Sequence, residues 1–318
     1  MTFLKAVLKK LKDFLLETLF APSGTALLVL SIMALLSLFN LINSTLFFSG
    51  NGWMLLMLPI AFGVPFYFFW LSRGGKKYLP TIHFELPKKV HIPVIVLSTL
   101  FIFLGSVLIK LLVLEGRYTE FPLYNMFFAH RNGKLWNDLY LVLTFCILVP
   151  ILEGIVFRGA IVKEHDKQGR LVTTVFSSLT FALLGFSFEA LLPRFFLGAL
   201  LCILLYATES ITLTVAVHVA YNFFAVFFEP MLISVKTVSS SYALFVFLIA
   251  IVTLVVAIFL FSHLSRLYKK YSHDKFGTSF VKSMPLEKSF WNLAYLCTSI
   301  PAIASIILFV IVTLIIEI

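Results

Sequence analysis

Long apolar runs that carry almost no charge constrain this chain more than any other feature. A helix needs about 20 apolar residues to cross the hydrocarbon core of a bilayer, and such runs follow one another along the 318 residues. Hydrophobic residues make up 60% of the chain and charged residues 13%, against about 25% charged in a soluble domain. The sequence therefore excludes a soluble enzyme, a disordered chain and a secreted disulfide scaffold. It predicts an all-α, polytopic membrane helix bundle.

Nine stretches of the sequence are predicted to be transmembrane helices. They are 24–48, 53–71, 92–114, 138–157, 171–188, 191–207, 211–228, 242–262 and 290–316. The fifth and sixth are separated by two residues only, so we expect a tight hairpin or a broken helix there. The chain is accordingly divided into a segment 1–20, N-terminal transmembrane helices 21–136, a core 137–230 and C-terminal transmembrane helices 231–318.

The positive charges of the chain predict its orientation. Segment 1–20 has apolar residues at helical spacing and lysines opposite them, which predicts a basic amphipathic helix that contacts membrane lipids. With a cytoplasmic N-terminus, roughly 18 lysines and arginines fall on inner segments and about 5, among them Arg194, on outer ones. The net charge of +10 is thus explained by topology, and no nucleic-acid partner is expected. We expect a multi-pass protein of a bacterial plasma membrane.

Ionisable residues inside predicted spans are costly and are therefore site candidates. Glu153 lies in the fourth span and Arg158 closes it, whereas His218 and Asn222 share one face of the seventh. Counted from the cytoplasmic interface, Glu153 and His218 both lie about 8–10 Å deep. This geometry permits a Glu–His–Asn cluster in a cavity open to the cytoplasm.

Purely structural explanations exist for the same residues. A buried Glu can serve only to pair with an Arg, and a buried His and Asn can serve only to bind a neighbouring helix. Arg158 is interpreted as structural, either as a snorkelling residue at the end of the span or as the partner of Glu153. Glu229, at the outer end of a span, is explained by solvation.

Two of these segments resemble the motifs of a known family. The stretch Glu153-Gly154-Ile155-Val156-Phe157-Arg158-Gly159, together with His218-Val219-Ala220-Tyr221-Asn222, resembles the CPBP family. That family includes the CAAX prenyl proteases of the Ras-converting type and the bacterial Abi proteins linked to bacteriocin processing and immunity. The resemblance covers roughly 140–228, so the core 137–230 is expected to be a CAAX-protease-like CPBP core.

The resemblance implies a glutamate-type protease site, and the chain departs from it at two chemical positions. Glu153 would be the general base, and His218 and Asn222 would be the oxyanion donors, with Arg158 in a supporting role. The second Glu of the first motif is Gly154 here, and the His that ends the second motif is Gly185. No cofactor or metal is implied, and Cys146, Cys202 and Cys297 are expected to be small core residues.

Two functions remain open from the sequence. The first is a non-catalytic CPBP-type protein with an incomplete protease site, which acts as a membrane regulatory or immunity-type partner of a membrane protein or peptide. The second is an active intramembrane endopeptidase that cleaves a membrane-associated peptide near the cytoplasmic face with Glu153 as general base. The two lost positions favour the first. A transporter is disfavoured because the buried polar groups cluster on one side of the membrane.

Overall fold

The computed structural model describes residues 23–46, 52–72, 91–113, 135–232, 242–274 and 285–317, and its regular elements are all helices. The longer ones are α2 (Gly24–Leu46), α3 (Gly52–Ser72), α4 (Ile92–Val113), α9 (Arg170–Leu183), α10 (Leu191–Thr208), α11 (Ile211–Phe227), α13 (Tyr242–Asp274), α14 (Leu286–Cys297) and α15 (Ile300–Glu317). Between α4 and α9, short helical segments follow one another from Leu135 to Gln168. The predicted helix at 1–20 lies outside the described residues, as do Arg117, Arg131, Lys134 and Lys236 of the predicted outer segments.

Each of the nine predicted spans overlaps a helix, but fewer than nine of the helices in the described part of the chain pass as membrane spans. In the described ranges four pass by length and composition, namely Ile92–Leu112, Asp138–His165, Leu191–Thr208 and Tyr242–Leu267. The bent pair α14–α15 makes five if it is counted as one span. Helix α9 has 14 residues and is about 21 Å long, shorter than a hydrocarbon core of about 30 Å. The chain is a multi-pass membrane protein with shorter apolar helices between its spans.

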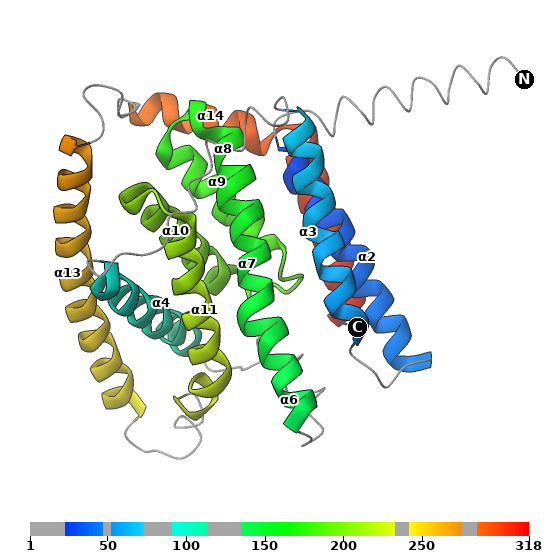
Figure 1. Cartoon of the computed structure of the whole chain (residues 1–318), viewed down its shortest axis with the longest axis horizontal. Helices are drawn as coiled ribbons and strands as arrows, with labels where there is room; N and C mark the ends of the chain where they lie inside the picture. The colour runs from blue at the N-terminus through cyan, green and yellow to red at the C-terminus, as the bar shows by residue number, and fades with distance from the viewer. Residues whose placement is uncertain are drawn as a thin grey trace, which may run out of the picture.

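The predicted span 290–316 is divided between two helices that pass as one span only when they are taken together. Helices α14 and α15 meet at 62°, and the Ser299 amide donates to the Leu296 carbonyl at the bend. Figure 1 shows α14 running across one end of the bundle, above the other helices. Its side chains Phe290, Trp291 and Tyr295 are exposed while Leu296 is buried, which is typical of a helix at a membrane interface.

Of the two arrangements expected between the fifth and sixth spans, the structure has the hairpin, in which α9 and α10 pack against each other and are joined by residues 184–190. The turn between α9 and α10 places the Phe186 ring 6.3 Å from that of Phe309 in α15. At the other end of α9, Gly169 precedes the helix with φ 99°, a left-handed conformation that favours glycine. A Cβ at Gly198 would lie 3.1 Å from the Ser178 Cα, so glycine lets the two helices approach closely.

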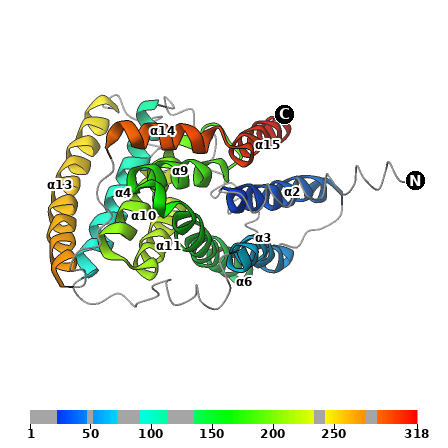
Figure 2. The ribbon, with the colours of Figure 1, turned by 90° about the horizontal axis from the view of Figure 1, so that it is seen from above.

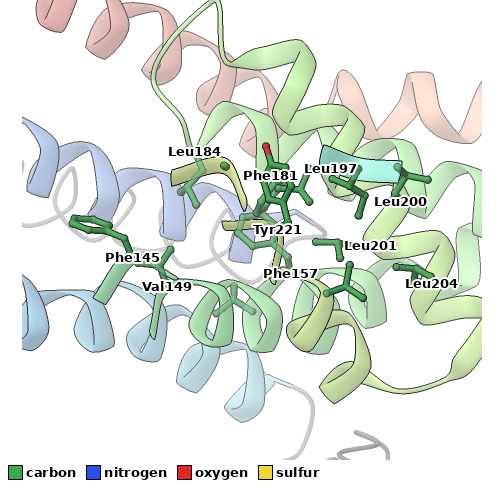
Figure 3. Packing of buried hydrophobic residues seen from close by; sticks show 14 of the residues in the cluster. Phe145, Val149, Phe157, Phe181, Leu184, Leu197, Leu200, Leu201, Leu204 and Tyr221 are labelled. Atoms are coloured by element: carbon green, nitrogen blue, oxygen red, sulfur yellow. The ribbon is translucent and has the colours of Figure 1, made fainter. Parts of the chain in front are cut away.

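The helices surround a core that the segments from Leu135 onward share with their neighbours. Helix α4 packs against α10, α11 and α13, and α2 packs against α3 and α15. Figure 2 shows α4 and α13 on one side and α2, α3 and α15 on the other, with α10 and α11 between them. Phe181, Tyr221 and Phe157 lie together in the middle of the core (Figure 3). The outer face of α13 exposes apolar residues along its length, among them Phe247 and Phe259, as expected for a lipid-facing surface.

Candidate functional site

Two π-helical segments flank Glu153. The span runs through η4 (Leu143–Leu148), α7 (Val149–Glu153) and η5 (Gly154–Ile161), and Glu153 ends the α-helical turn between them. The sequence predicted a regular helix here. π-Helical turns are uncommon and occur frequently at functional sites, so the backbone alone marks the surroundings of Glu153 as unusual.

The first π-helical segment explains the contact of Asn222. The Val149 amide donates to the Thr144 carbonyl, and Pro150 has no N–H to offer. The Phe145 carbonyl therefore lacks its usual helical donors, and the Asn222 Nδ2 atom donates to it at 3.0 Å. The side chain of Asn222 is thus used to satisfy a buried backbone carbonyl.

Glu153 and His218 meet, as the sequence geometry allowed. The His218 Nε2 atom lies 3.5 Å from the Glu153 Oε2 atom. Both residues are almost fully buried, since His218 is 3% exposed and Glu153 is 4% exposed. The ring of Phe181 stands edge-on to the His218 imidazole at 5.8 Å. The sequence geometry permitted a cavity open to the cytoplasm at this place. In the structure, both side chains are instead packed inside the bundle.

Arg194 is the site residue that sequence reasoning missed. Its Nη2 atom donates to the Glu153 Oε1 atom at 3.1 Å, and its Nε atom donates to the Phe181 carbonyl at 3.4 Å. The sequence analysis counted Arg194 only among the cations of the outer segments, whereas in the structure it lies in the first turn of α10 and is 8% exposed. Its position inside the predicted span 191–207 was the available signal.

Side chains fill the two positions where the CPBP motifs would place a Glu and a His. A Cβ at Gly185 would lie 2.8 Å from the Arg194 Cδ atom, so the stem of Arg194 occupies that space. A Cβ at Gly154 would collide with a methyl group of Val215. Neither site has room for a larger side chain in the present packing.

Arg158 is neither a snorkelling residue nor the hydrogen-bonded partner of Glu153. It is 2% exposed, and its guanidinium lies 4.8 Å from the centroid of the Phe181 ring and 6.0 Å from that of Phe157. Among the described residues none accepts a hydrogen bond from its Nε, Nη1 or Nη2 atom. The burial of Arg158 contradicts the snorkelling interpretation, whereas its interaction with Glu153 is electrostatic and involves no hydrogen bond.

A second buried ion pair corrects the interpretation of Glu229. The Lys110 Nζ atom contacts the Glu229 carboxylate, and both residues are buried. Glu229 is therefore bound by α4 rather than by solvent.

The composition of the site limits its chemistry. Within the described ranges, no three His, Cys, Asp or Glu residues lie close enough to hold a metal ion. The groups that do converge are one carboxylate, one imidazole and two guanidiniums. Such a set can bind and orient an anionic group, and its carboxylate and imidazole are groups that can transfer protons.

One family model matches this part of the chain, the model described as type II CAAX prenyl endopeptidase Rce1-like, over residues 135–224. Residues 135–224 are a CPBP-family domain. The matched region contains Glu153, Arg158, Arg194, His218 and Asn222, whereas the Lys110–Glu229 pair lies outside it. Searches of curated proteins and of solved structures gave no match.

Proposed function

We propose that this protein is a non-hydrolytic CPBP-type membrane protein that acts by binding a membrane partner, in a regulatory or immunity-type role. One observation carries the proposal. Arg194 fills the space of the missing second-motif His and binds the carboxylate that would serve as general base. The site retains the family's framework while its base is bound to a cation.

The contacts of each group support this proposal. A general base must hold the attacking water within about 3 Å and accept its proton. One oxygen of Glu153 is bound by Arg194 and the other faces His218. The Asn222 amide, which would stabilise an oxyanion, donates to the Phe145 carbonyl. Loss of even one oxyanion donor typically costs about 100- to 1000-fold in rate.

Endopeptidase activity is the second candidate function, and it is favoured by the distance between Glu153 and His218. The separation of 3.5 Å between Glu153 and His218 is close to that of a cooperating acid–base pair. For hydrolysis, Arg194 would have to leave the carboxylate so that water and a peptide near the cytoplasmic face could enter.

The experiment compares wild type with Glu153→Gln and His218→Ala at matched expression, in cells that lack the native copy. The readout is a global scan of the termini of membrane peptides. Arg170→Gln is the control variant, because Arg170 lies over the Tyr206 ring outside the site. We expect the same termini in all four strains. Specific cleavage events that disappear in both site variants and persist in the control would establish the endopeptidase instead.

A further inference from the structure

The charges buried in the Rce1-like domain do not balance. Arg158 and Arg194 carry permanent positive charges, and both are within electrostatic reach of Glu153. Among the described residues, the electrostatic neighbours of Arg158 are the buried thiol of Cys202 and the Glu153 carboxylate, and Arg194 binds the same carboxylate. One cation is therefore in excess at a place that solvent hardly reaches, since Arg158 is 2% exposed.

Arg158 is the cation that lacks a hydrogen-bonding partner among the described residues. Arg194 uses its guanidinium on Glu153 and on the Phe181 carbonyl. The three nitrogens of Arg158 are buried, and no described residue accepts a hydrogen bond from them. A charged group without a partner is costly in a protein interior. The rings of Phe181 and Phe157 offer some compensation through cation–π attraction, but they accept none of its five N–H donors.

Both guanidinium groups lie against the same ring. The distance to the centroid of Phe181 is 4.8 Å for Arg158 and 4.6 Å for Arg194. Phe181, which is labelled in Figure 3, lies in the buried core. The positive potential of two guanidiniums is therefore concentrated around one apolar ring, where screening by water is weak.

We propose that Arg158 binds a small monovalent anion, a halide or a short carboxylate such as formate, beside Phe181. Such an anion neutralises the excess charge and accepts hydrogen bonds from the guanidinium, whose planar N–H groups suit anions. The inference goes beyond the proposed function, because it concerns a bound anion that neither a partner-binding nor a peptidase role requires.

The test uses the full-length protein in phosphatidylcholine nanodiscs, which contain no anionic lipid. Sodium chloride or sodium formate replaces sodium gluconate at constant ionic strength, since gluconate is too bulky for so buried a site. Thermal unfolding is followed by fluorescence, and equilibrium dialysis with radiolabelled chloride or formate counts the bound anions. We expect a saturable rise in Tm with either anion and about one bound anion per chain.

Three variants separate this site from unspecific salt effects. Arg158→Gln should abolish both the rise in Tm and the bound anion, whereas the matched control Arg170→Gln should retain them. Glu153→Gln removes the competing carboxylate and should tighten anion binding by about tenfold.

Three results would overturn the proposal: no saturable binding to wild type, unchanged binding to Arg158→Gln, or weaker binding to Glu153→Gln. If Arg158→Gln does not fold, the direction of the Glu153→Gln effect decides alone. Because the readout is anion binding, it is distinct from the peptide-terminus scan that tests the proposed function.

Discussion

Two buried ionic sites in this bundle differ in their balance of charge. In the first, Lys110 of α4 is bound to Glu229, one cation to one anion. In the second, Glu153 is bound by Arg194 while Arg158 stays beside it without a hydrogen-bonding partner in the described part of the chain. The first has the composition of a structural clamp between helices. The second carries an excess cation, which is costly to bury without a hydrogen-bonding partner.

The largest effect is expected at the balanced pair. Lys110→Met leaves the Glu229 carboxylate buried without its cation, so the free energy of unfolding should fall by about 3–5 kcal/mol. The double variant Lys110→Met/Glu229→Leu should recover most of that loss. Unfolding in mixed detergent micelles measures both. A double variant as unstable as the single one would show that Lys110 acts through other contacts.

A smaller effect is expected at the unbalanced site. Arg194→Met removes one hydrogen-bonded cation, but Arg158 remains within electrostatic reach of Glu153. The free energy of unfolding should therefore fall by about 1–3 kcal/mol, less than for Lys110→Met. The same unfolding assay ranks the two variants. If Arg194→Met proves the more damaging, Arg158 does not compensate Glu153 and the two sites are alike.

A single methyl group at Gly185 tests the placement of Arg194. The Cβ of Gly185→Ala would lie 2.8 Å from the Arg194 Cδ atom, and the guanidinium is held at its other end by Glu153. The variant should lose about 1 kcal/mol through overpacking. Gly159→Ala is the matched control, because its Cβ would meet the Ile211 Cδ1 atom at an ordinary 3.8 Å. Equal stability of the two alanine variants would contradict the packing described here.

The smallest loss of stability is expected at an uncharged hydrogen bond in the same core. Tyr221→Phe removes the hydrogen bond between the Tyr221 hydroxyl and the Ser106 Oγ atom, which are 3.2 Å apart. Because the ring stays buried, the loss should be about 0.6 kcal/mol, as for other hydrogen bonds between membrane helices. If the free energy of unfolding falls as much as for Arg194→Met, the expectation that the ionic contact stabilises the core more than the neutral one is contradicted.

The sequence by itself determined where the helices lie, and it allowed Glu153 and His218 to meet. Apolar runs with few charges can satisfy their backbone in a bilayer only as helices, which is why every predicted span overlaps one. The pairing of Glu153 with His218 was within reach because depth along a helix follows from residue count.

Only the tertiary structure decided which helices are long enough to cross the bilayer and which groups bind Glu153. Hydropathy does not report the 62° bend before α15 or the short α9. Arg194 is three residues into a span and 41 residues from Glu153 in the sequence, and the α9–α10 hairpin brings it there. Whether a polar side chain in an apolar run faces lipid, solvent or a partner depends on how neighbouring helices pack. This packing cannot be predicted from a single sequence. The charge balance around Arg158 therefore follows only from the tertiary structure.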